Sequence, residues 1–451
     1  MEDSLDKDQL YDVIIIGAGP AGFIASYESL ILGQKVLVID EGESGRQNYA
    51  SSLYDSRFAN SSTGGIGGAA RIWGAQSGFL DTTSLNEWQL ISNFGENEVA
   101  QLFESMHRVN KILNIQIAPD NYYPIKSEKF LKDTASKFGI DLRHTNFPKD
   151  HDIENHWKKI LKNQNLKVIL GESLRNITAS GFSNYDLNFS SGKVLRSNGA
   201  IVIISAGTVS TTEIILRSFP DLSEHFKVGD SLIDHPCGVV ATFKANGNKR
   251  FLRGQILRTR YGTLKRKYQY RQNYEIGIAE LQYSLVGKAS GILTLLRANI
   301  NRISIRLLKR FILRPLNFDV WIQIEQSSSN QLKLNKEGIL ESNWMYSDVD
   351  REHVKRIYAA MKNMLTSEGF NIENEANLDD LDFSQAFHPS STIKMHKDPG
   401  HGVVNCFGIM HSHPRILIAS AAVFPKPGWV NPSFLIMCLS SMGVRKILEN
   451  A

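Results

Sequence analysis

Apolar residues follow two different periods along the chain, and the change of period predicts its elements. Residues 12–16 and 35–39 are short apolar runs rich in β-branched residues, which is typical of strands buried on both faces of a parallel sheet. Residues 20–32 between them have a helical pattern that stops at Gly33, and residues 200–204 predict another buried strand. Strands connected in this way by a crossover helix predict a Rossmann-like domain.

The rest of the chain predicts longer helices and a second kind of sheet. Helices are expected at residues 84–114, 348–369 and 434–448, the last of them packing back on the first domain. Strand-like segments are expected at 168–170, 177–189, 276–283 and 318–324. Alternation of apolar and polar positions predicts an antiparallel sheet with one covered face. We therefore expect the α/β class, α+β overall, in which a Rossmann-like domain is interleaved with a domain of antiparallel sheet plus helices.

Three glycines follow the first buried strand at G-x-G-x-x-G spacing. Gly17 permits a tight turn, Gly19 lets the backbone approach a pyrophosphate, and Gly22 lets the next helix pack closely on the strand. The helix begins at Pro20 and Ala21, where its free amides and the positive end of its dipole favour phosphate. The spacing predicts a dinucleotide cradle.

An acidic residue ends the second buried strand, about twenty residues after the glycines, where a carboxylate accepts hydrogen bonds from a ribose 2′-hydroxyl. This residue is Asp40. Because a carboxylate repels a 2′-phosphate, NAD or FAD is expected rather than NADP. A glycine-rich turn of an unrelated α/β protein is the alternative, but here strand, glycines, helix, strand and acid are all in register.

Two further segments contain glycines at places where a cofactor would be approached. Residues 64–76 read GGIGGAARIWGAQ and include Arg71, Ile72 and Trp73. Glycine pairs without bulk let backbone amides reach a planar ring or a phosphate. Residues 198–217 predict a buried strand, then Ala206-Gly207, then a helix that begins with serine and threonine residues.

In this order the segments resemble the glucose–methanol–choline (GMC) family of FAD-dependent oxidoreductases, in particular its bacterial and cholesterol-oxidase-like branch. The shared motifs are the dinucleotide fingerprint, Gly67-Gly68 with Trp73-Gly74, Ala206-Gly207 with Thr211, Asp234-His235-Pro236, His388-Pro389 and Asn431-Pro432. The resemblance implies an FAD-binding domain in three parts, residues 10–85, 161–236 and 385–451. It implies a substrate domain at residues 86–160 and 237–384.

The resemblance also implies roles for two residues near the C-terminal end. The family's H-P histidine is the catalytic base, which implies that role for His388, and Asn431 matches a second polar residue that is His or Asn in the family. An amide cannot take a proton, but it can bind and orient the substrate oxygen. From the residues alone, the alternatives are a core histidine and an asparagine that caps a helix begun at Pro432. His235 is expected only to shape a turn.

The fingerprint and the resemblance together imply a cofactor site of many residues. They are Gly17, Gly19, Pro20, Ala21, Gly22, Asp40, Gly67, Gly68, Ile72, Trp73, Leu174, Ala206, Gly207, Ser420, Ala421, Asn431 and Pro432. Where the family has Asp-Ala-Ser, this chain has Ser420-Ala421-Ala422, so the contact of that acid must come from Ser420 or from backbone. Residues 64–76 contain no histidine that could tether a flavin, so non-covalent FAD is expected.

The resemblance implies an enzyme that oxidises a CH–OH group of an alcohol, sugar or sterol-like molecule, by proton abstraction and hydride transfer to flavin N5. A small-molecule alcohol is therefore the expected substrate. Oxygen, a quinone or a protein remains open as the electron acceptor. Two alternatives stay open: a lyase of this family that works without net redox, and a non-catalytic relative that binds FAD.

Length and composition agree with a globular protein of two domains. The 451 residues are 42% hydrophobic and 22% charged, and three cysteines show no spacing for zinc or disulfides. His396, His401, His411 and His413 also match no tetrahedral ligand pattern, so no metal is expected. The N-terminal residues are acidic, without the apolar core of a signal peptide, and no apolar run approaches the roughly eighteen residues of a membrane span. A cytoplasmic location is expected.

Basic residues are concentrated in the segment from Lys249 to Arg314. This segment holds 16 Lys and Arg against two acids, whereas the net charge of the whole chain is +5. An apolar stripe through Leu296–Phe311 at helical spacing predicts a basic amphipathic helix there. Three interpretations are open: peripheral association with anionic membrane on the inner face, binding of an anionic substrate or acidic partner, or a solvated cationic face. Nucleic acid is not expected, because no recognition fold accompanies the charge.

Overall fold

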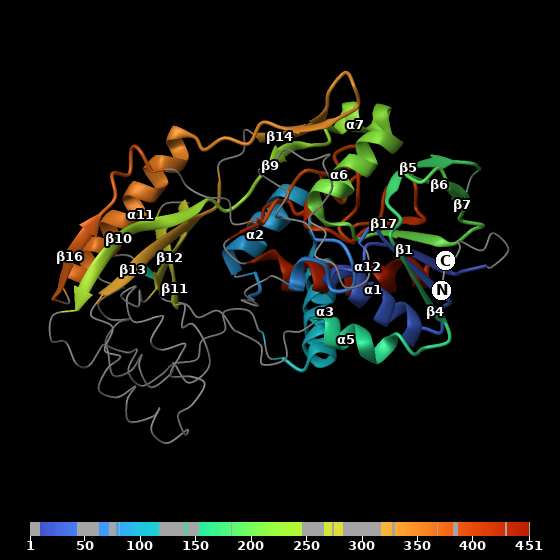
Figure 1. Cartoon of the computed structure of the whole chain (residues 1–451), viewed down its shortest axis with the longest axis horizontal. Helices are drawn as coiled ribbons and strands as arrows, with labels where there is room; N and C mark the ends of the chain where they lie inside the picture. Colours follow the sequence, from blue (N-terminus) through green and yellow to red (C-terminus); the bar gives the residue numbers. More distant parts are fainter. Residues whose placement is uncertain are drawn as a thin grey trace.

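The computed structural model shows two lobes, one built on a parallel sheet and the other on a larger antiparallel sheet with a long helix across it (Figure 1). It describes residues 10–42, 63–71, 78–80, 82–115, 117, 140–141, 153–181, 183–245, 266–272, 275–282, 317–326, 330–367, 369–381, 387–428 and 431–450. The expected fold class, a Rossmann-like domain interleaved with an antiparallel-sheet domain, is confirmed.

Parallel strands form the first sheet in the order β17-β8-β1-β2-β4. They are β1 (Val13–Ile16), β2 (Val36–Asp40), β4 (Leu166–Leu170), β8 (Ile201–Ile204) and β17 (Ile416–Ile418). Every residue of β1, β2, β8 and β17 is buried, which requires that both faces of the sheet are covered. The carboxyl ends of strands from three distant parts of the chain are thereby brought to one edge.

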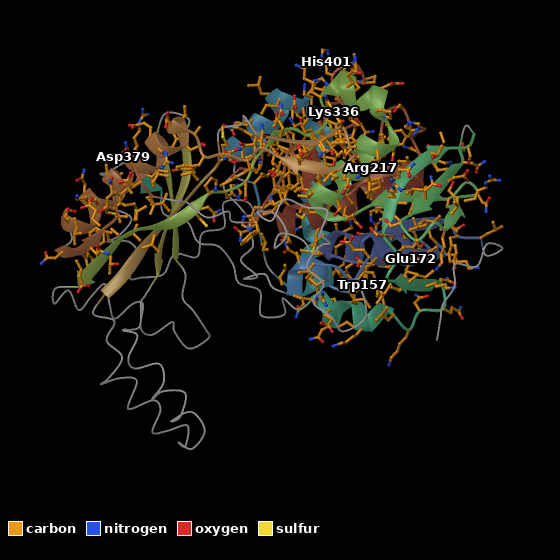
Figure 2. All side chains as sticks on the ribbon, turned by 45° about the horizontal axis from the view of Figure 1, so that its top comes forward. Trp157, Glu172, Arg217, Lys336, Asp379 and His401 are labelled. Atoms are coloured by element: carbon orange, nitrogen blue, oxygen red, sulfur yellow. The ribbon has the colours of Figure 1, made fainter. Side chains whose placement is uncertain are left out.

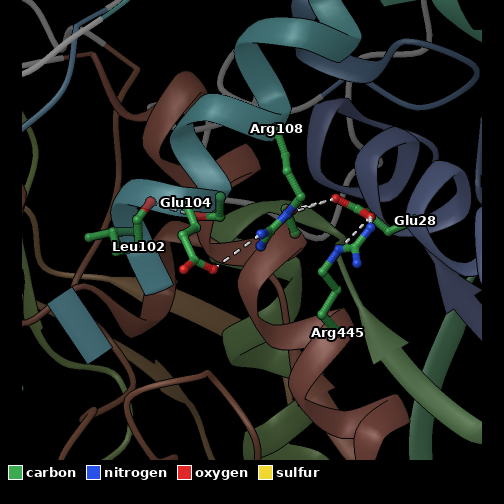
Figure 3. A network of polar contacts seen from close by, with 7 residues as sticks. Glu28, Leu102, Glu104, Arg108 and Arg445 are labelled. Carbon is green, nitrogen blue, oxygen red and sulfur yellow. Dashed lines mark hydrogen bonds and ion pairs between the residues drawn. The ribbon is translucent and has the colours of Figure 1, made fainter. Parts of the chain in front are cut away.

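Three helices on this sheet meet around one buried carboxylate (Figure 3). Glu28 is 1% exposed and pairs with Arg445 at 2.7 Å and Arg108 at 3.5 Å. Because two guanidinium groups face it, the buried charge is compensated. The helices are α1 (Pro20–Ile31), α3 (Glu96–Leu113) and α12 (Pro432–Glu449). The last helix therefore packs on the first domain as expected.

The structure divides the chain differently from the expected boundaries. Residues 86–160 were assigned to the substrate domain, but Leu102 of α3 and Trp157 of α5 (Ile153–Ile160) lie in the core of the parallel-sheet lobe. Trp157 also donates its indole N–H to the Ala18 carbonyl. Of the described residues in this range, only β3 (Ile140–Asp141) belongs to the antiparallel sheet. The amphipathic face of α3 is buried against α12, which periodicity alone could not foresee.

Two expected segments are each interrupted by a turn. The helical segment 84–114 is two helices, α2 (Thr82–Ser92) and α3, because Asn93 adopts a left-handed φ of 53°. The strand-like segment 177–189 is a hairpin of β5 (Leu174–Ala179) and β6 (Tyr185–Phe189), extended by β7 (Val194–Arg196). Apolar alternation continues across such a turn, so the pattern did not reveal it.

The antiparallel sheet has the strand order β16-β10-β13-β12-β11-β3. Helix α11 (Asp348–Ser367) lies on it and buries the predicted apolar side chains, among them Ile357 and Met361, against Phe243 and Ile322. Gly369 ends this helical region with a φ of 83°. The remaining strands are β10 (Cys237–Ala245), β11 (Arg266–Gln272), β12 (Glu275–Gln282), β13 (Asn317–Ile324) and β16 (Phe370–Glu375).

A small sheet connects the two lobes. Its strands are β9 (Asp230–Leu232), β14 (Asn330–Leu334) and β15 (Leu340–Ser342), in the order β15-β14-β9. Leu332 and Leu340 pack with Val209 of helix α6 (Gly207–Ser218). This part of the 237–384 segment therefore packs on the lobe of the parallel sheet. Short helices α7 (Pro220–Phe226), η2 (Gly68–Arg71) and η3 (Ala421–Val423) complete the described elements.

The predicted amphipathic helix at 296–311 lies outside the described residues, and within the basic block only the strands β11 and β12 are described. None of the helices in the described part of the chain combines the length and the apolar character needed to cross a membrane.

Candidate functional site

A cavity of about 730 Å³ opens where the strands of the parallel sheet end. Parallel α/β sheets bind ligands at this edge. The lining includes residues from the first strand to the last helix. The expected site residues on its wall are Gly17, Gly19, Pro20, Ala21, Asp40, Gly68, Leu174, Ala206, Gly207, His388, Ser420, Ala421, Asn431 and Pro432.

The glycine-rich turn has the geometry of a phosphate cradle. Gly17 has a φ of 103°, and a Cβ at Gly22 would stand 2.0 Å from the Gly17 carbonyl oxygen, so neither position accepts a side chain. A Cβ at Gly19 would meet no atom within 4 Å, because it would point into open space, and Gly19 lines the cavity. Helix α1 begins beside it with Pro20 at its first position. The amides of this helix start are therefore available to an anion.

The carboxylate of Asp40 lies at the centre of this turn and is 7% exposed. It accepts hydrogen bonds from the backbone amides of Ala18 at 2.7 Å and Gly42 at 2.8 Å, and from the amide of Gly65. Asp40 thus holds together the first glycine turn and the second glycine segment. Its expected role toward a ribose is additional to this structural one.

The second glycine segment packs directly on the first. A Cβ at Gly68 would stand 2.8 Å from the Gly19 Cα, and Gly67 donates its amide to the Ala18 carbonyl at 2.9 Å without lining the cavity. Close approach of two backbones explains the glycine at position 68, and a φ of 91° explains the glycine at position 67. Ile72 and Trp73, also expected at the cofactor, lie outside the described residues.

Several acidic and basic residues on the cavity wall were not expected from the sequence. Glu41 follows Asp40 on the wall, and burial together with the neighbouring Asp40 charge raises the pKa of its carboxyl. Arg217 of α6 binds Glu213 at 2.7 Å and donates to the Gly338 carbonyl at 2.6 Å. Gly338 lies in the turn between β14 and β15, so this contact connects the small sheet to the cavity wall. No motif marks these residues, because topology alone brings them together.

These contacts lie in the lobe of the parallel sheet. Figure 2 shows Arg217 and Glu172 in this lobe, whereas Asp379 lies in the other lobe. Glu172, another residue of the cavity wall, is held by Lys193 and Ser191. The hydrogen bonds from both partners lower the pKa of Glu172, although burial opposes them as the largest single influence.

The segment with His388 is anchored to helix α6. Thr208 donates its hydroxyl to the Pro389 carbonyl, and Thr212 and Thr392 share a hydrogen bond of 2.6 Å between their buried hydroxyls. The amide of Ser391 donates to the Ala421 carbonyl at 3.0 Å. The Ala206-Gly207 turn and the C-terminal motifs, distant in sequence, are therefore one structural unit.

His388 lies on the cavity wall, half-buried, beside an exposed Phe387 with a φ of 60°. A non-glycine residue in this region is strained and is held only where the surroundings determine it. The backbone amide of His388 donates to Asp234 Oδ1 at 2.8 Å, and the amide of His235 donates to the same oxygen at 2.7 Å. One buried carboxylate therefore sets the position of both histidines.

The structure corrects the expectation for His235, which was to shape a turn only. The His235 ring is 1% exposed, and its Nδ1 lies 3.2 Å from Nδ1 of His388. Its Nε2 lies 2.8 Å from the Gly428 carbonyl oxygen. Asp234-His235-Pro236 follows β9 and belongs to neither the glycine fingerprint nor a strand pattern. Only the folding of the chain brings it against His388.

Asn431 lies on the wall of the same cavity as His388. It occupies the residue before α12, as the capping alternative supposed, but its side chain makes no capping hydrogen bond. Ser420 does act as a cap, because its hydroxyl accepts the Ala422 amide at 3.2 Å at the start of η3. Ser420 and Asn431 both lie on the wall of the cavity, where contacts with a cofactor or substrate were expected.

The other C-terminal histidines have local partners. His411 Nε2 lies 2.9 Å from the His396 carbonyl oxygen, and His413 stacks on Phe219 with ring centroids 4.4 Å apart. Among the described residues, no group of three or more His, Cys, Asp or Glu side chains is placed to hold a metal ion.

The cavity fits a dinucleotide by three features of its wall: the open space at Gly19, the start of α1 and the glycine turn at Gly207, where a Cβ would meet no atom within 4 Å. These features leave backbone amides and open space where the pyrophosphate of a dinucleotide would lie.

The chain is similar to known proteins in part of its sequence and in its fold. A model of the family described as GMC oxidoreductase matches residues 325–440. The solved structure of pyridoxine 4-oxidase from Mesorbium loti is similar over 96% of this chain and 98% of that chain, with a TM-score of 0.65 and 13% identity. A digeranylgeranylglycerophospholipid reductase from Methanococcus aeolicus is 54% identical over 43 residues. That match spans 10% of this chain and 10% of the reductase.

The family model and the shared fold support an oxidoreductase of the flavoprotein type. The match to the GMC oxidoreductase family model includes the His388 segment and the first half of α12, and the fold of pyridoxine 4-oxidase is shared over nearly the whole length. The place of the chain in the cholesterol-oxidase-like branch stays a prediction.

The buried Asp234 predicts a dependence of stability on pH. Burial raises the pKa of its carboxyl to about 6, against the opposing effect of amide hydrogen bonds from His235 and His388. A pKa raised above the unfolded value of about 3.9 contributes stability at low pH that is lost as pH rises through about 6, at most about 3 kcal/mol.

Asp234→Asn keeps the amide-accepting oxygen and removes the charge, so its melting temperature relative to the unchanged protein should rise between about pH 4 and pH 7. Differential scanning calorimetry of both proteins over this range measures the difference. A difference that stays constant with pH would contradict the raised pKa.

Proposed function

We propose that the protein oxidises a CH–OH group of a small-molecule alcohol, with FAD bound non-covalently in the cavity. One observation carries the proposal: His388 and Asn431 line the same cavity as the glycine-rich turn. A base, a hydroxyl-binding amide and a dinucleotide cradle are the groups that this oxidation needs. When bound, FAD would accept the hydride that leaves the carbon.

His388 would take the proton of the substrate hydroxyl. The ordinary pKa of imidazole lies close to neutrality, so histidine needs little adjustment to act as a base there. The hydrogen bond from the His388 backbone amide to Asp234 and the one from the Thr208 hydroxyl to the Pro389 carbonyl hold this segment at the cavity wall, and the contact of Nδ1 with His235 holds the ring. A fixed ring needs no reorientation before proton transfer, which lowers the barrier.

Asn431 would bind the hydroxyl oxygen through its side-chain NH₂ group and orient the hydroxyl toward His388. Because an amide does not accept a proton at ordinary pH, its contribution is one of position and not of acid–base chemistry. Its place before Pro432 restricts its backbone to the extended region, where it has a φ of −63° and a ψ of 133°.

Gly19, the start of α1, Asp40 and Gly207 would hold the dinucleotide. His388 is the one histidine among the described residues of the cavity wall, and no cysteine of that wall is described. Since His388 would be needed as base, this distribution supports non-covalent binding.

Anaerobic mixing of the yellow protein with a panel of alcohols tests the function. The panel contains pyridoxine, which the structural relative is named for, together with sugars, sterols, long-chain alcohols and polyols. Loss of the visible flavin absorbance with one class would support the proposal and identify that class. Admission of oxygen, or of a soluble quinone under argon, would then show which acceptor restores the colour.

Two other outcomes correspond to the other functions that the scaffold allows. Cleavage of a cyanohydrin-like substrate with no loss of flavin colour would indicate a lyase. Bound FAD with neither reduction nor cleavage over the whole panel would indicate a non-catalytic relative. Either outcome would overturn the proposed oxidation.

We also propose that the protein is cytoplasmic and rests peripherally on the inner, anionic face of a membrane. The support is the basic block at residues 249–314 with its apolar stripe. A lipid-borne or amphiphilic alcohol would then reach the site from the membrane.

Co-sedimentation with vesicles rich in anionic lipid should show binding at low salt that is lost at high salt, because such charges act over roughly 8–10 Å. At about 1 kcal/mol per basic residue, Arg306→Glu with Arg310→Glu should weaken binding by about 30-fold or more. Lys158→Glu with Lys159→Glu on α5 is the matched control and should bind as before. Protein that stays in the supernatant at low salt would show that the block is only a solvated face.

A further inference from the structure

A chain of hydrogen bonds leads from a backbone carbonyl to His388. The Gly428 carbonyl oxygen lies 2.8 Å from Nε2 of His235, and Nδ1 of His235 lies 3.2 Å from Nδ1 of His388. The two rings are nearly perpendicular, with an interplanar angle of 77°. Gly428 and His235 are both buried, so their contact is shielded from bulk water.

The chemistry of these groups determines where the protons lie. A carbonyl oxygen only accepts, so Nε2 of His235 must carry a proton and donate it. In a neutral imidazole the other nitrogen is then an acceptor, and Nδ1 of His235 can only accept. The partner must donate, which places the proton of His388 on Nδ1. Nε2 of His388 is left without a proton, as a general base requires.

We propose that His235 is a positioning residue that selects the tautomer of His388 in which Nε2 is ready to take a proton. The inference rests on the proposed role of His388 as base. It assigns to the D-H-P histidine a function in proton transfer, through His388 and without contact to substrate.

The opposite arrangement would lose this hydrogen bond. If His388 carried its proton on Nε2, two nitrogen lone pairs would face each other across 3.2 Å. A cationic His235 would donate from both nitrogens, and His388 would then be forced into the tautomer that cannot act as base at Nε2. Asp234 Oδ1 accepts the backbone amides of both histidines, so one carboxylate anchors the two backbones from which the paired rings project.

Nitrogen NMR of histidine-labelled, FAD-bound protein tests the tautomer without any substrate. At a pH well above the ordinary pKa of imidazole, the signals that disappear in His388→Ala belong to His388, and they should show a protonated Nδ1 and an unprotonated Nε2. A protonated Nε2 would overturn the proposal.

Variants of His235 test the consequence for catalysis. His235→Leu removes the acceptor, and we expect flavin reduction to slow by about 10–100-fold, the usual effect of removing a group that orients a functional histidine, with little change in KM. His235→Gln offers a carbonyl oxygen to His388 and an NH₂ group to the Gly428 carbonyl, so it should recover most of the loss. His413→Leu, which removes a ring packed on Phe219 outside the cavity, is the control and should reduce flavin at the original rate.

The outcomes separate the two proposals. If no alcohol reduces the flavin, the proposed function fails, while the NMR pattern of the unchanged protein still decides the tautomer. If flavin is reduced and His235→Leu keeps the full rate, the positioning role is wrong although the function stands. If His235→Leu does not fold, two results support the proposal: a rate of flavin reduction in His235→Gln close to that of the unchanged protein, and an unprotonated Nε2 of His388. A protonated Nε2 contradicts it.

Discussion

Replacement of His388 by alanine is expected to slow flavin reduction by about 10²–10⁴-fold, the span that removal of a general base usually produces. The ring lies on the cavity wall and its backbone is held by Asp234, so alanine removes the imidazole without moving the segment. Stopped-flow mixing with the alcohol identified by the bleaching panel measures the rate directly.

The same experiment distinguishes the base from the orienting amide. His388→Ala should retain FAD, because the glycine turn and α1 hold the dinucleotide elsewhere on the wall. Asn431→Ala should cost less in rate and more in the binding and orientation of the alcohol, since no proton is transferred there. A rate of reduction unchanged in His388→Ala would show that another group takes the proton.

Gly19→Val is expected to abolish FAD binding while the chain still folds. Gly19 has a φ of −73° and a ψ of −169°, which valine adopts readily, and its Cβ would meet no protein atom within 4 Å. The branched side chain would instead enter the open space beside the start of α1, where the backbone must approach the pyrophosphate. The purified variant should be colourless with an ordinary circular dichroism spectrum.

Gly22→Val provides the contrast. A Cβ there would stand 2.0 Å from the Gly17 carbonyl oxygen, so this variant should lose the packing of α1 on β1 and the fold of the lobe with it. Acid or heat should release FAD from the unchanged protein with no flavin left on the polypeptide. Retention of bound flavin by folded Gly19→Val would contradict the cradle, and flavin left on precipitated chain would contradict non-covalent binding.

The amino-acid sequence determined the local features that depend on neighbouring residues. β-branched runs at 12–16 and 200–204 predicted strands buried on both faces, and the glycine spacing predicted the turn at Gly17, because backbone geometry restricts which residues can occupy such places. The apolar positions of α11 likewise predicted its buried face. The resemblance carried by dispersed motifs predicted the GMC family, whose model matches residues 325–440, and it named His388 and Asn431 as site residues.

Only the tertiary structure decided which distant segments meet. The sheet aligns β1 with β8, and α6 anchors the His388 segment. Asp234, His235 and His388 thereby become neighbours, although the elements from β10 to β16 separate them along the chain. Periodicity records which face of an element is apolar but not which partner covers it. For that reason residues 86–160 were expected in the substrate domain, whereas Leu102 and Trp157 lie in the core of the parallel-sheet lobe. The contact of His235 with His388 was not expected either. A hydrogen bond between two side chains requires positions within a few tenths of an ångström, and packing of the whole core sets those positions.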